Sequence, residues 1–372
     1  MKKISAVFGL TAACAVALSF GALFKDELPE HESAAIVSPS EIFERSAYGS
    51  ETGLVTVPIA DFKSGSLPEL NSVSVTFVGD CVLAANLNDT REDSFVKYAE
   101  VKEPSYFFEN AVPYYASSDY VIASCETVLS DRSLFRTEKE GEAFWFKSPS
   151  DYAGIFSAGC IDAVNLSNNH TYDYGAEGYE DTIASLTSAG IAWGDTENPI
   201  YFKKNGVTVA VVCARLFNEN SDTVITPAIE GVMENSDIQI LYFHGGEEYE
   251  HVPEDWMTEL CHKYVDMGVD LIVGSHPHVL RPMEEYNGAH IVYSIGNFCY
   301  GANRTPENRT VIFTETFYFN EDGEYEGAEE TITPFYVYTG SHSNWQPAPV
   351  TDSIEASKTM SFMYGGGDVP NP

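Results

Sequence analysis

The stretch DLIVGSHPHV, residues 270–279, joins an apolar run to two histidines, His276 and His278, that lie on either side of a proline. The apolar run is typical of a buried β-strand, which Gly274 ends. Alternate side chains of a strand point to the same face, so both imidazoles can face the same way where the strand ends. Two such imidazoles suit one metal ion, two neighbouring ions or an anionic ligand. The alternative is a polar loop with two surface histidines, and the rest of the chain decides between them.

Apolar runs of strand length recur on both sides of this stretch. They are residues 73–79, 119–124, 162–167, 207–214, 238–243, 290–296 and 310–319. Two segments with apolar residues at helical spacing, 179–190 and 253–268, separate some of them, and each ends on a glycine. In the second helix we expect Trp256, Leu260 and Tyr264 to face the core. Strands that first alternate with helices and then follow one another directly predict an α/β fold with a mixed sheet.

The charge of the chain limits its partners. The 372 residues carry a formal net charge of −36, with a pI of about 4.3. This argues against nucleic acid as a partner, because binding a duplex needs a cationic face. An anionic ligand would instead need a local cation on this acidic protein.

The N-terminal segment is typical of an exported protein. Lys2 and Lys3 precede an uncharged stretch, residues 4–24, which is long enough to span a bilayer. Because the lysines stay on the cytoplasmic side, the rest of the chain is expected to lie outside. We expect residues 1–24 to be an uncleaved signal anchor in the cell membrane, and a cleaved signal peptide with a secreted protein is the alternative. A linker, one folded domain and a loop-like C-terminal tail are expected to follow, over residues 25–70, 71–340 and 341–372.

Polar side chains follow several of the predicted strands directly. They are Asp80, Glu126, Asn168, Asn169, His170, His244, His276, His278 and Asn297. Binding sites of open α/β sheets form at the carboxyl ends of the strands. A turn or cap explains any one of these residues, and we assign such a role to Asp173. It does not explain the same ligand chemistry at six strand ends. A mixed shell of Asp, Glu, Asn and His suits a divalent ion such as Mn, Fe or Zn, which polarises a phosphoryl or carbonyl oxygen and lowers the pKa of bound water.

Several segments of the chain together form a known pattern. They are GDCVLAANL (79–87), SCETVLSD (124–131), LSNNHTYDYG (166–175), HGGEEYEHVPEDW (244–256), SHPHV (275–279) and YSIGNF (293–298). In this order and spacing they resemble the CapA family of poly-γ-glutamate capsule synthesis proteins, over roughly residues 73–315. The resemblance implies a metallophosphatase-like α/β/β/α sandwich with mixed sheets, related to the calcineurin-like enzymes, and a role in capsule or exopolymer biosynthesis.

The resemblance also implies a role for each polar residue. Metal ligands would be Asp80, Glu126, Asn169, His244, His276 and His278. His170 would be catalytic together with Asn169, acting as an acid or orienting a phosphate. The sequence departs from the metallophosphatase pattern at Val82, where the first motif, Asp-x-His, has a histidine. The site would therefore hold one metal ion, hold two weakly, or hold none and bind an anion.

Asn297, Arg281 and Glu247, near these motifs, are candidates for substrate binding. Arg281 follows the HPH motif and could meet an anionic substrate. Glu247 and Glu248 follow His244 and would either orient histidines or stay solvated. Asn297 would cap a turn near the site or contact a ligand.

Two functional hypotheses follow. The first is an exported, membrane-tethered, metal-dependent hydrolase that acts on a phosphoester, or on an amide bond in an anionic envelope polymer such as poly-γ-glutamate. The second is a non-catalytic polymer-binding or assembly component that works with membrane partner proteins of a capsule export complex. We favour the hydrolase because the Asn-His pair at residues 169–170 is present. A solute-binding protein fits less well, because a binding pocket does not need four imidazoles.

Overall fold

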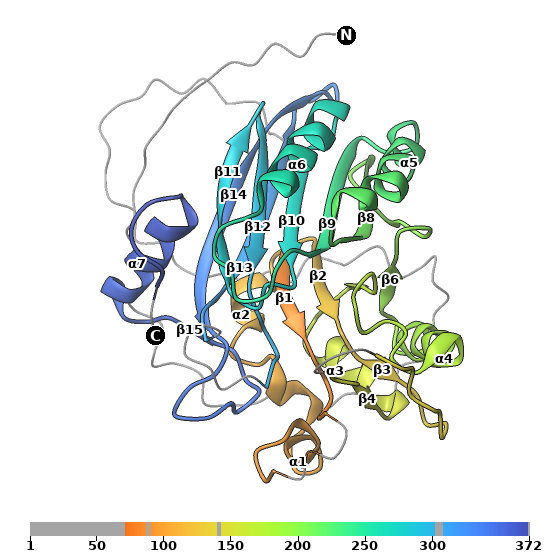
Figure 1. The fold of residues 1–372 in the computed structure, drawn as a ribbon. Helices are drawn as coiled ribbons and strands as arrows, with labels where there is room; N and C mark the ends of the chain where they lie inside the picture. Colours follow the sequence, from red (N-terminus) through yellow and green to blue (C-terminus); the bar gives the residue numbers. More distant parts are fainter. Residues whose placement is uncertain (1–70, 87–88, 90, 140–142, 302–307, 371–372) are drawn as a thin grey trace. The chain divides into compact units, whose positions relative to one another are not determined.

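The structure is a computed structural model that describes residues 71–370, apart from 87–88, 90, 140–142 and 302–307 (Figure 1). These residues all belong to one compact unit of the chain, Phe43–Pro372. The anchor expected over residues 1–24 and the linker expected over 25–70 lie outside the described part. Within that part, no helix is both long enough and apolar enough to cross a membrane.

Two mixed β-sheets form the centre of the domain. The first has the strand order β15-β14-β13-β1-β2-β5-β6, with β15 at Ala348–Pro349, β14 at Tyr325–Tyr336, β13 at Thr310–Phe319, β1 at Asn71–Cys81, β2 at Tyr120–Cys125, β5 at Ala163–Asn165 and β6 at Ala192–Gly194. In it β1, β2, β5 and β6 are parallel, whereas β13, β14 and β15 pair antiparallel.

The second sheet has the order β11-β12-β10-β9-β8-β7. Its strands are β11 at Leu280–Tyr286, β12 at Ala289–Ile295, β10 at Leu271–Ser275, β9 at Ile238–Gly245, β8 at Val207–Leu216 and β7 at Ile200–Lys204. The four inner strands are parallel, and each edge strand pairs antiparallel. A separate short pair joins β3 (Val128–Leu129) to β4 (Lys147–Ser148).

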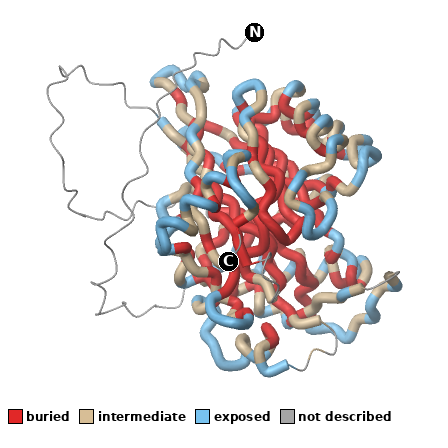
Figure 2. The backbone as a smooth tube through the Cα atoms, turned by 60° about the vertical axis from the view of Figure 1, so that its left-hand side comes forward, coloured by how far each residue is buried: buried red, intermediate tan, exposed pale blue. Residues whose placement is uncertain are grey.

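The central strands of the two sheets are buried on both faces, as Figure 2 shows for the centre of the domain. Along β1, Val75 and Phe77 face the space between the sheets, whereas Val78 faces outward. Along β8, Val211 faces inward and Val212 outward. Burial on both faces explains why these strands read as continuous apolar runs instead of alternating ones.

Helices cover the outer face of each sheet. Those on the first sheet are α1 (Phe95–Ala99), α2 (Val112–Tyr115), α3 (Ala153–Ala158) and α4 (Gly175–Ser188). Those on the second are α5 (Asp222–Met233) and α6 (Asp255–Met267), which Figure 1 shows beside β8, β9 and β10. Short 3₁₀ turns lie at Pro104–Phe107, Ser150–Tyr152 and Glu219–Ser221. The α/β/β/α sandwich with mixed sheets is therefore confirmed.

The buried face of α6 differs from the predicted one. Tyr264 is buried as expected, but Met257 and Cys261 are the other fully buried residues of the stripe. Trp256 and Leu260 lie one position earlier, at the margin of the core, and are only partly buried. Large apolar residues on two adjacent rows of a helix leave the direction of the stripe open, and packing against β9 and β10 decides it.

The C-terminal segment is not the loop that the sequence suggested. Helix α7 (Ser353–Met363) begins at Asp352, whose carboxylate accepts hydrogen bonds from the N–H groups of Ile354 and Glu355. Its Phe362 and Met363 belong to the core between the sheets. The N-cap aspartate stabilises the start of this helix, and the packing of its apolar end on the core supplies the rest of its stability.

Candidate metal-binding site

The predicted polar residues converge where the strands end. Asp80 is the next-to-last residue of β1. Its carboxylate accepts a hydrogen bond of 2.9 Å from the N–H of His276, just beyond β10. The backbone of Asp80 also pairs with Asn297, which follows β12. Glu126 follows β2, and His244 lies at the end of β9. Five strands from two sheets thus deliver side chains to one place, and every one of these five side chains is at least nine-tenths buried.

Two carboxylates form the deepest part of the site. One Asp80 oxygen, Oδ1, lies 3.4 Å from His244 Nδ1, and Glu126 Oε2 lies 3.9 Å from His244 Nε2. Asp80 Oδ1 and both oxygens of Glu126 are buried and accept no hydrogen bond from any described residue. Leaving buried charged or polar oxygens unpaired is costly, at about 1–3 kcal/mol each or more. Asp80, Glu126 and His244 place one ligand atom each within 4.8 Å of the others, so a divalent cation fits this donor set.

The protonation states favour cation binding. Burial raises the pKa of Glu126 well above its usual value, and the neighbouring charge of Asp80 adds to this. Burial also acts against ionisation of Asp80, but the close imidazole of His244, the charge of His278 and the hydrogen bond from the N–H of His276 outweigh it and hold the pKa of that carboxyl below its usual range. Burial lowers the pKa of His244, and that of His276 further, so both imidazoles are neutral at pH 7. Neutral imidazole is the form that coordinates metal, and a bound cation would displace the proton of Glu126.

Hydrogen bonds orient the histidine rings. His278 Nδ1 lies 2.8 Å from Asn297 Oδ1, and the amide nitrogen of Asn297 donates to the His278 carbonyl at 3.3 Å. This second bond fixes Oδ1 toward the ring, so Nδ1 carries the proton and Nε2 keeps its lone pair. His244 Nε2 lies 2.9 Å from Asn169 Oδ1 and 3.0 Å from His276 Nδ1. Asn297 therefore positions a histidine, and Asn169 reaches the imidazole cluster as predicted.

His170 forms a pair with Asp173. Its Nδ1 lies 2.9 Å from Asp173 Oδ2, and its Nε2 lies 3.9 Å from Glu126 Oε2. Asp173 is fully buried, accepts a hydrogen bond from the N–H of Phe146 and is in contact with the Lys139 ammonium. Asp173 therefore has a role beyond the predicted turn, and its i, i+3 spacing from His170 was the signal for it. The carboxylate holds the proton on Nδ1 and directs Nε2 toward the site.

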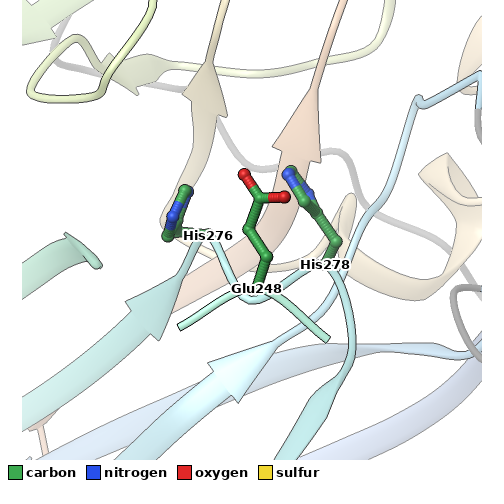
Figure 3. Close-up of side chains that lie close together, drawn as sticks. All are labelled: Glu248, His276 and His278. Carbon is green, nitrogen blue, oxygen red and sulfur yellow. The ribbon is translucent and has the colours of Figure 1, made fainter. Parts of the chain in front are cut away.

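A second group of ligand atoms lies beside the first. Glu248, His276 and His278 place one atom each within 4.8 Å of the others, and Figure 3 shows the Glu248 carboxylate between the two imidazoles. Next to it is a pocket of about 230 Å³. Its lining includes Val82, Asn86, Asp89, Arg91, Phe144, Phe146, His170, Glu248, Tyr249, His278, Tyr300 and Trp345. Glu247 was the predicted substrate contact, but Glu248, for which no role was predicted over solvation, is the residue that lies at the site.

Arg281 does not reach the site. Its side chain is fully buried and forms a salt bridge of 2.8 Å with Glu254. Its remaining donors bond the carbonyls of Glu247 and Glu250. All of its charge is therefore used inside the protein, which differs from the predicted contact with an anionic substrate. The exposed side chain of Glu247 likewise lies outside the cluster of ligand atoms.

Comparison with known proteins gives relatives that cover most of the chain. The PGA biosynthesis protein CapA of Bacillus subtilis (strain 168) is 28% identical over 311 residues, covering 77% of this chain and 76% of the relative. The capsule biosynthesis protein CapA of Bacillus anthracis is 28% identical over 319 residues, covering 78% and 72%. The crystal structure of 5'-nucleotidase from Candida albicans SC5314 aligns with 72% of this chain and 52% of that chain, with a TM-score of 0.37 and 10% identity.

The family match spans the strands that form the site. The pattern described as "Bacterial capsule synthesis protein PGA_cap" covers residues 74–302, which is more than half of the chain. This range begins in β1, before Asp80, and ends after Asn297, so it contains every predicted ligand. The chain therefore belongs to the PGA_cap family of bacterial capsule synthesis proteins, as the resemblance of its motifs to CapA predicted.

Proposed function

We propose that the chain is a divalent-metal-dependent hydrolase of capsule or poly-γ-glutamate biosynthesis, acting on an amide or phosphoester bond of an anionic envelope polymer. One observation supports the metal above all others. Asp80 and Glu126 present three buried oxygens without a hydrogen-bond partner among the described residues, next to neutral imidazoles. A bound divalent cation would give these oxygens the partner that they lack.

The ligands of one or two such cations would be Asp80, Glu126, Asn169, His244, His276 and His278. Oxygen and imidazole donors of this kind suit Mn, Fe or Zn. When bound, the cation would lower the pKa of water and polarise the bond to be cleaved.

His170 would move the proton in this reaction. Asp173 holds Nδ1–H, which leaves the lone pair of Nε2 on the side of Glu126 and the pocket. In this position Nε2 can take up the proton of the attacking water and return it to the leaving group. Burial lowers the pKa of His170 and Asp173 opposes this, so the ring is kept in the neutral form that accepts a proton.

The pocket supports a substrate of limited size. A volume of about 230 Å³ accommodates one unit of a polymer and not a folded partner. Phe146, Tyr300, His170 and His278 all line this pocket. An acidic protein that binds an anionic polymer needs positive charge at the point of contact, and the bound cation would supply it.

Metal content and hydrolysis test this proposal together. The full chain is purified without chelator, its metal is measured by mass spectrometry, and a phosphomonoester and a γ-glutamyl amide are offered as substrates. We expect Mn, Fe or Zn at one or more equivalents and hydrolysis of at least one substrate. The His244→Ala variant should lose both the bound metal and the hydrolytic activity. Absence of metal after reconstitution would reject the metal-dependent mechanism.

Val82 supports a second candidate, a polymer-binding or assembly component without catalysis. The side chain at this position cannot bind metal, whereas the metallophosphatase pattern has a histidine there. In that case the protein would bind the metal and the polymer, but His170→Gln would leave polymer binding unchanged and no substrate would be cleaved.

We further propose that the domain works outside the cytoplasm, tethered by residues 4–24. The basis is the sequence, in which Lys2 and Lys3 precede the apolar stretch. Protease added to intact cells should digest the domain while the N-terminal segment stays in the membrane fraction. Full protection in intact cells and digestion only after lysis would contradict the tether.

A further inference from the structure

Glu248 projects from a loop whose backbone is fixed by hydrogen bonds from Arg281. The loop runs from Gly245, at the end of β9, to Glu254, before α6. Buried Arg281 donates hydrogen bonds to the carbonyls of Glu247, at 3.1 Å, and Glu250, at 2.8 Å. Its Nη1 also donates a hydrogen bond of 2.8 Å to the Glu254 carboxylate. The two carbonyls lie on either side of Glu248, so the Arg281 clamp fixes the backbone from which this carboxylate projects.

The same loop is attached to the histidine segment. The N–H of Tyr249 donates to the carbonyl of Pro277 at 2.8 Å, and Pro277 lies between His276 and His278. Tyr249, His276 and His278 all have positive φ, at 66°, 97° and 60°. Non-glycine residues in this region cost of order 1–3 kcal/mol each and persist where the surroundings require them. Three such residues around Glu248 show that the backbone is held in the geometry that brings the carboxylate to both imidazoles.

Val82 lies beside Glu248 and His278. It lines the pocket together with Glu248 and His278, and it is 2% exposed. The metallophosphatase pattern has a metal-binding histidine at this position. Val82 therefore offers no ligand on the side of the pocket that Glu248 and His278 also line.

We propose that Glu248 completes a second divalent-cation position with His276 and His278, in place of the ligand lost at Val82. The inference rests on the proposed function and specifies how many cations the site holds. Two imidazoles and one carboxylate are a donor set for Zn²⁺ or Mn²⁺. The first position would then be the buried group of Asp80, Glu126 and His244, and the second the one at the pocket.

Binding stoichiometry tests this position independently of catalysis. The full chain is stripped of metal and titrated with Zn²⁺ or Mn²⁺ by calorimetry, and bound metal is counted by mass spectrometry. We expect two equivalents in the unmodified protein. Glu248→Gln should retain one and bind the second at least ten- to a hundredfold more weakly, because even groups that only orient a ligand cost that much. Glu250→Gln is the matched control, since it removes the same charge from an exposed side chain of the same loop.

The outcomes separate the two proposals. Two equivalents in Glu248→Gln, with unchanged affinities, would overturn the inference, and so would a single equivalent in the unmodified protein. Glu248→Asp serves as a second variant, because a carboxylate that is one carbon shorter should weaken the second equivalent without removing it. Two equivalents that depend on Glu248, without hydrolysis of any substrate, would support the inference and reject the proposed catalysis.

Discussion

At the scale of single residues, the three side chains of the buried donor group all lie at the ends of strands. Asp80, Glu126 and His244 follow apolar strands directly, and the end of a strand fixes where such a side chain lies. Glu248 and Arg281 lie in a loop and on an edge strand, where position along the chain says little about direction. Arg281 donates inward because it balances Glu254, and that partner is visible only in the fold.

The pairing of His170 with Asp173 leads to a prediction at this scale. Asp173→Asn keeps the shape of the side chain but can donate to Nδ1, which would move the ring proton to Nε2 and remove the lone pair that faces the site. We expect the rate of hydrolysis to fall by about 10²–10⁴-fold, the range for loss of general acid–base catalysis. Metal content should stay unchanged, because Asp173 is not among the ligands.

A matched variant gives the control for this prediction. Asp181→Asn removes a carboxylate that binds Arg132 on the exposed side of α4, away from the pocket. Its rate should equal that of the unmodified protein. Equal rates for both variants would mean that Asp173 only shapes the turn.

At the scale of elements, the buried central strands were predictable from the sequence, whereas the exposed strand β14 and helix α7 were not. The runs at 73–79 and 207–214 form β1 and β8, because burial on both faces leaves a continuous apolar signal. By contrast β14 is rich in glutamate, and most of its residues are partly or fully exposed. It forms because it pairs with β13 along ten residues, and a single sequence does not show its partner. Helix α7 is likewise defined by its packing on the core between the sheets.

The loop clamped by Arg281 gives a prediction about an element. Gly246 has a φ of 95°, and a Cβ added there would lie 2.6 Å from Arg281 Nη1. Gly246→Ala should therefore destabilise the protein by more than the 1–2 kcal/mol that a left-handed alanine costs by itself. It should also weaken the cation position at Glu248, because Arg281 must move. Urea unfolding and metal titration measure the two effects.

Gly288→Ala isolates the contribution of the clamp. Gly288 also has a positive φ, 86°, but a Cβ there meets no atom within 4 Å. It should show the conformational cost alone and leave metal binding unchanged. Equal loss of stability in both variants would mean that Arg281 shifts freely and does not hold the loop.

At the scale of the whole domain, the cation and the fold are expected to be coupled. Both sheets contribute ligands, with Asp80 and Glu126 from the first and His244 from the second. A cation bound to all three stabilises the sandwich, by about 2.7 kcal/mol when its concentration is a hundred times its Kd. Removing the metal with a chelator should lower Tm, and the shift should disappear in the double variant Asp80→Asn, Glu126→Gln. A Tm that is insensitive to chelator would show that the two sheets hold together without the ion.

A second link between the sheets leads to a prediction about pH. His290 of β12, in the second sheet, lies 2.9 Å from Glu315 of β13 and 3.5 Å from Glu330 of β14, both in the first. Burial works against its charge, but the hydrogen bond and charge of Glu315, with Glu330 and the neighbouring Glu285, raise the pKa of His290 above its usual value. A raised pKa in the folded state means that this stability is complete below the unfolded pKa of about 6.5 and is lost as the pH rises through the folded pKa.

Burial also raises the pKa of Glu315, so its titration acts in the same direction and stability again falls as the pH rises. We therefore expect His290→Gln to lower the free energy of unfolding at pH 6 by about 1–3 kcal/mol, and by less at pH 9, where the imidazole has lost its charge. His262→Gln is the control, because His262 of α6 pairs with Glu284 of β11, in the second sheet, and does not join the two sheets. Urea unfolding at both pH values measures the difference, and an equal loss at pH 6 and pH 9 would show that the imidazole contributes by packing and not by its charge.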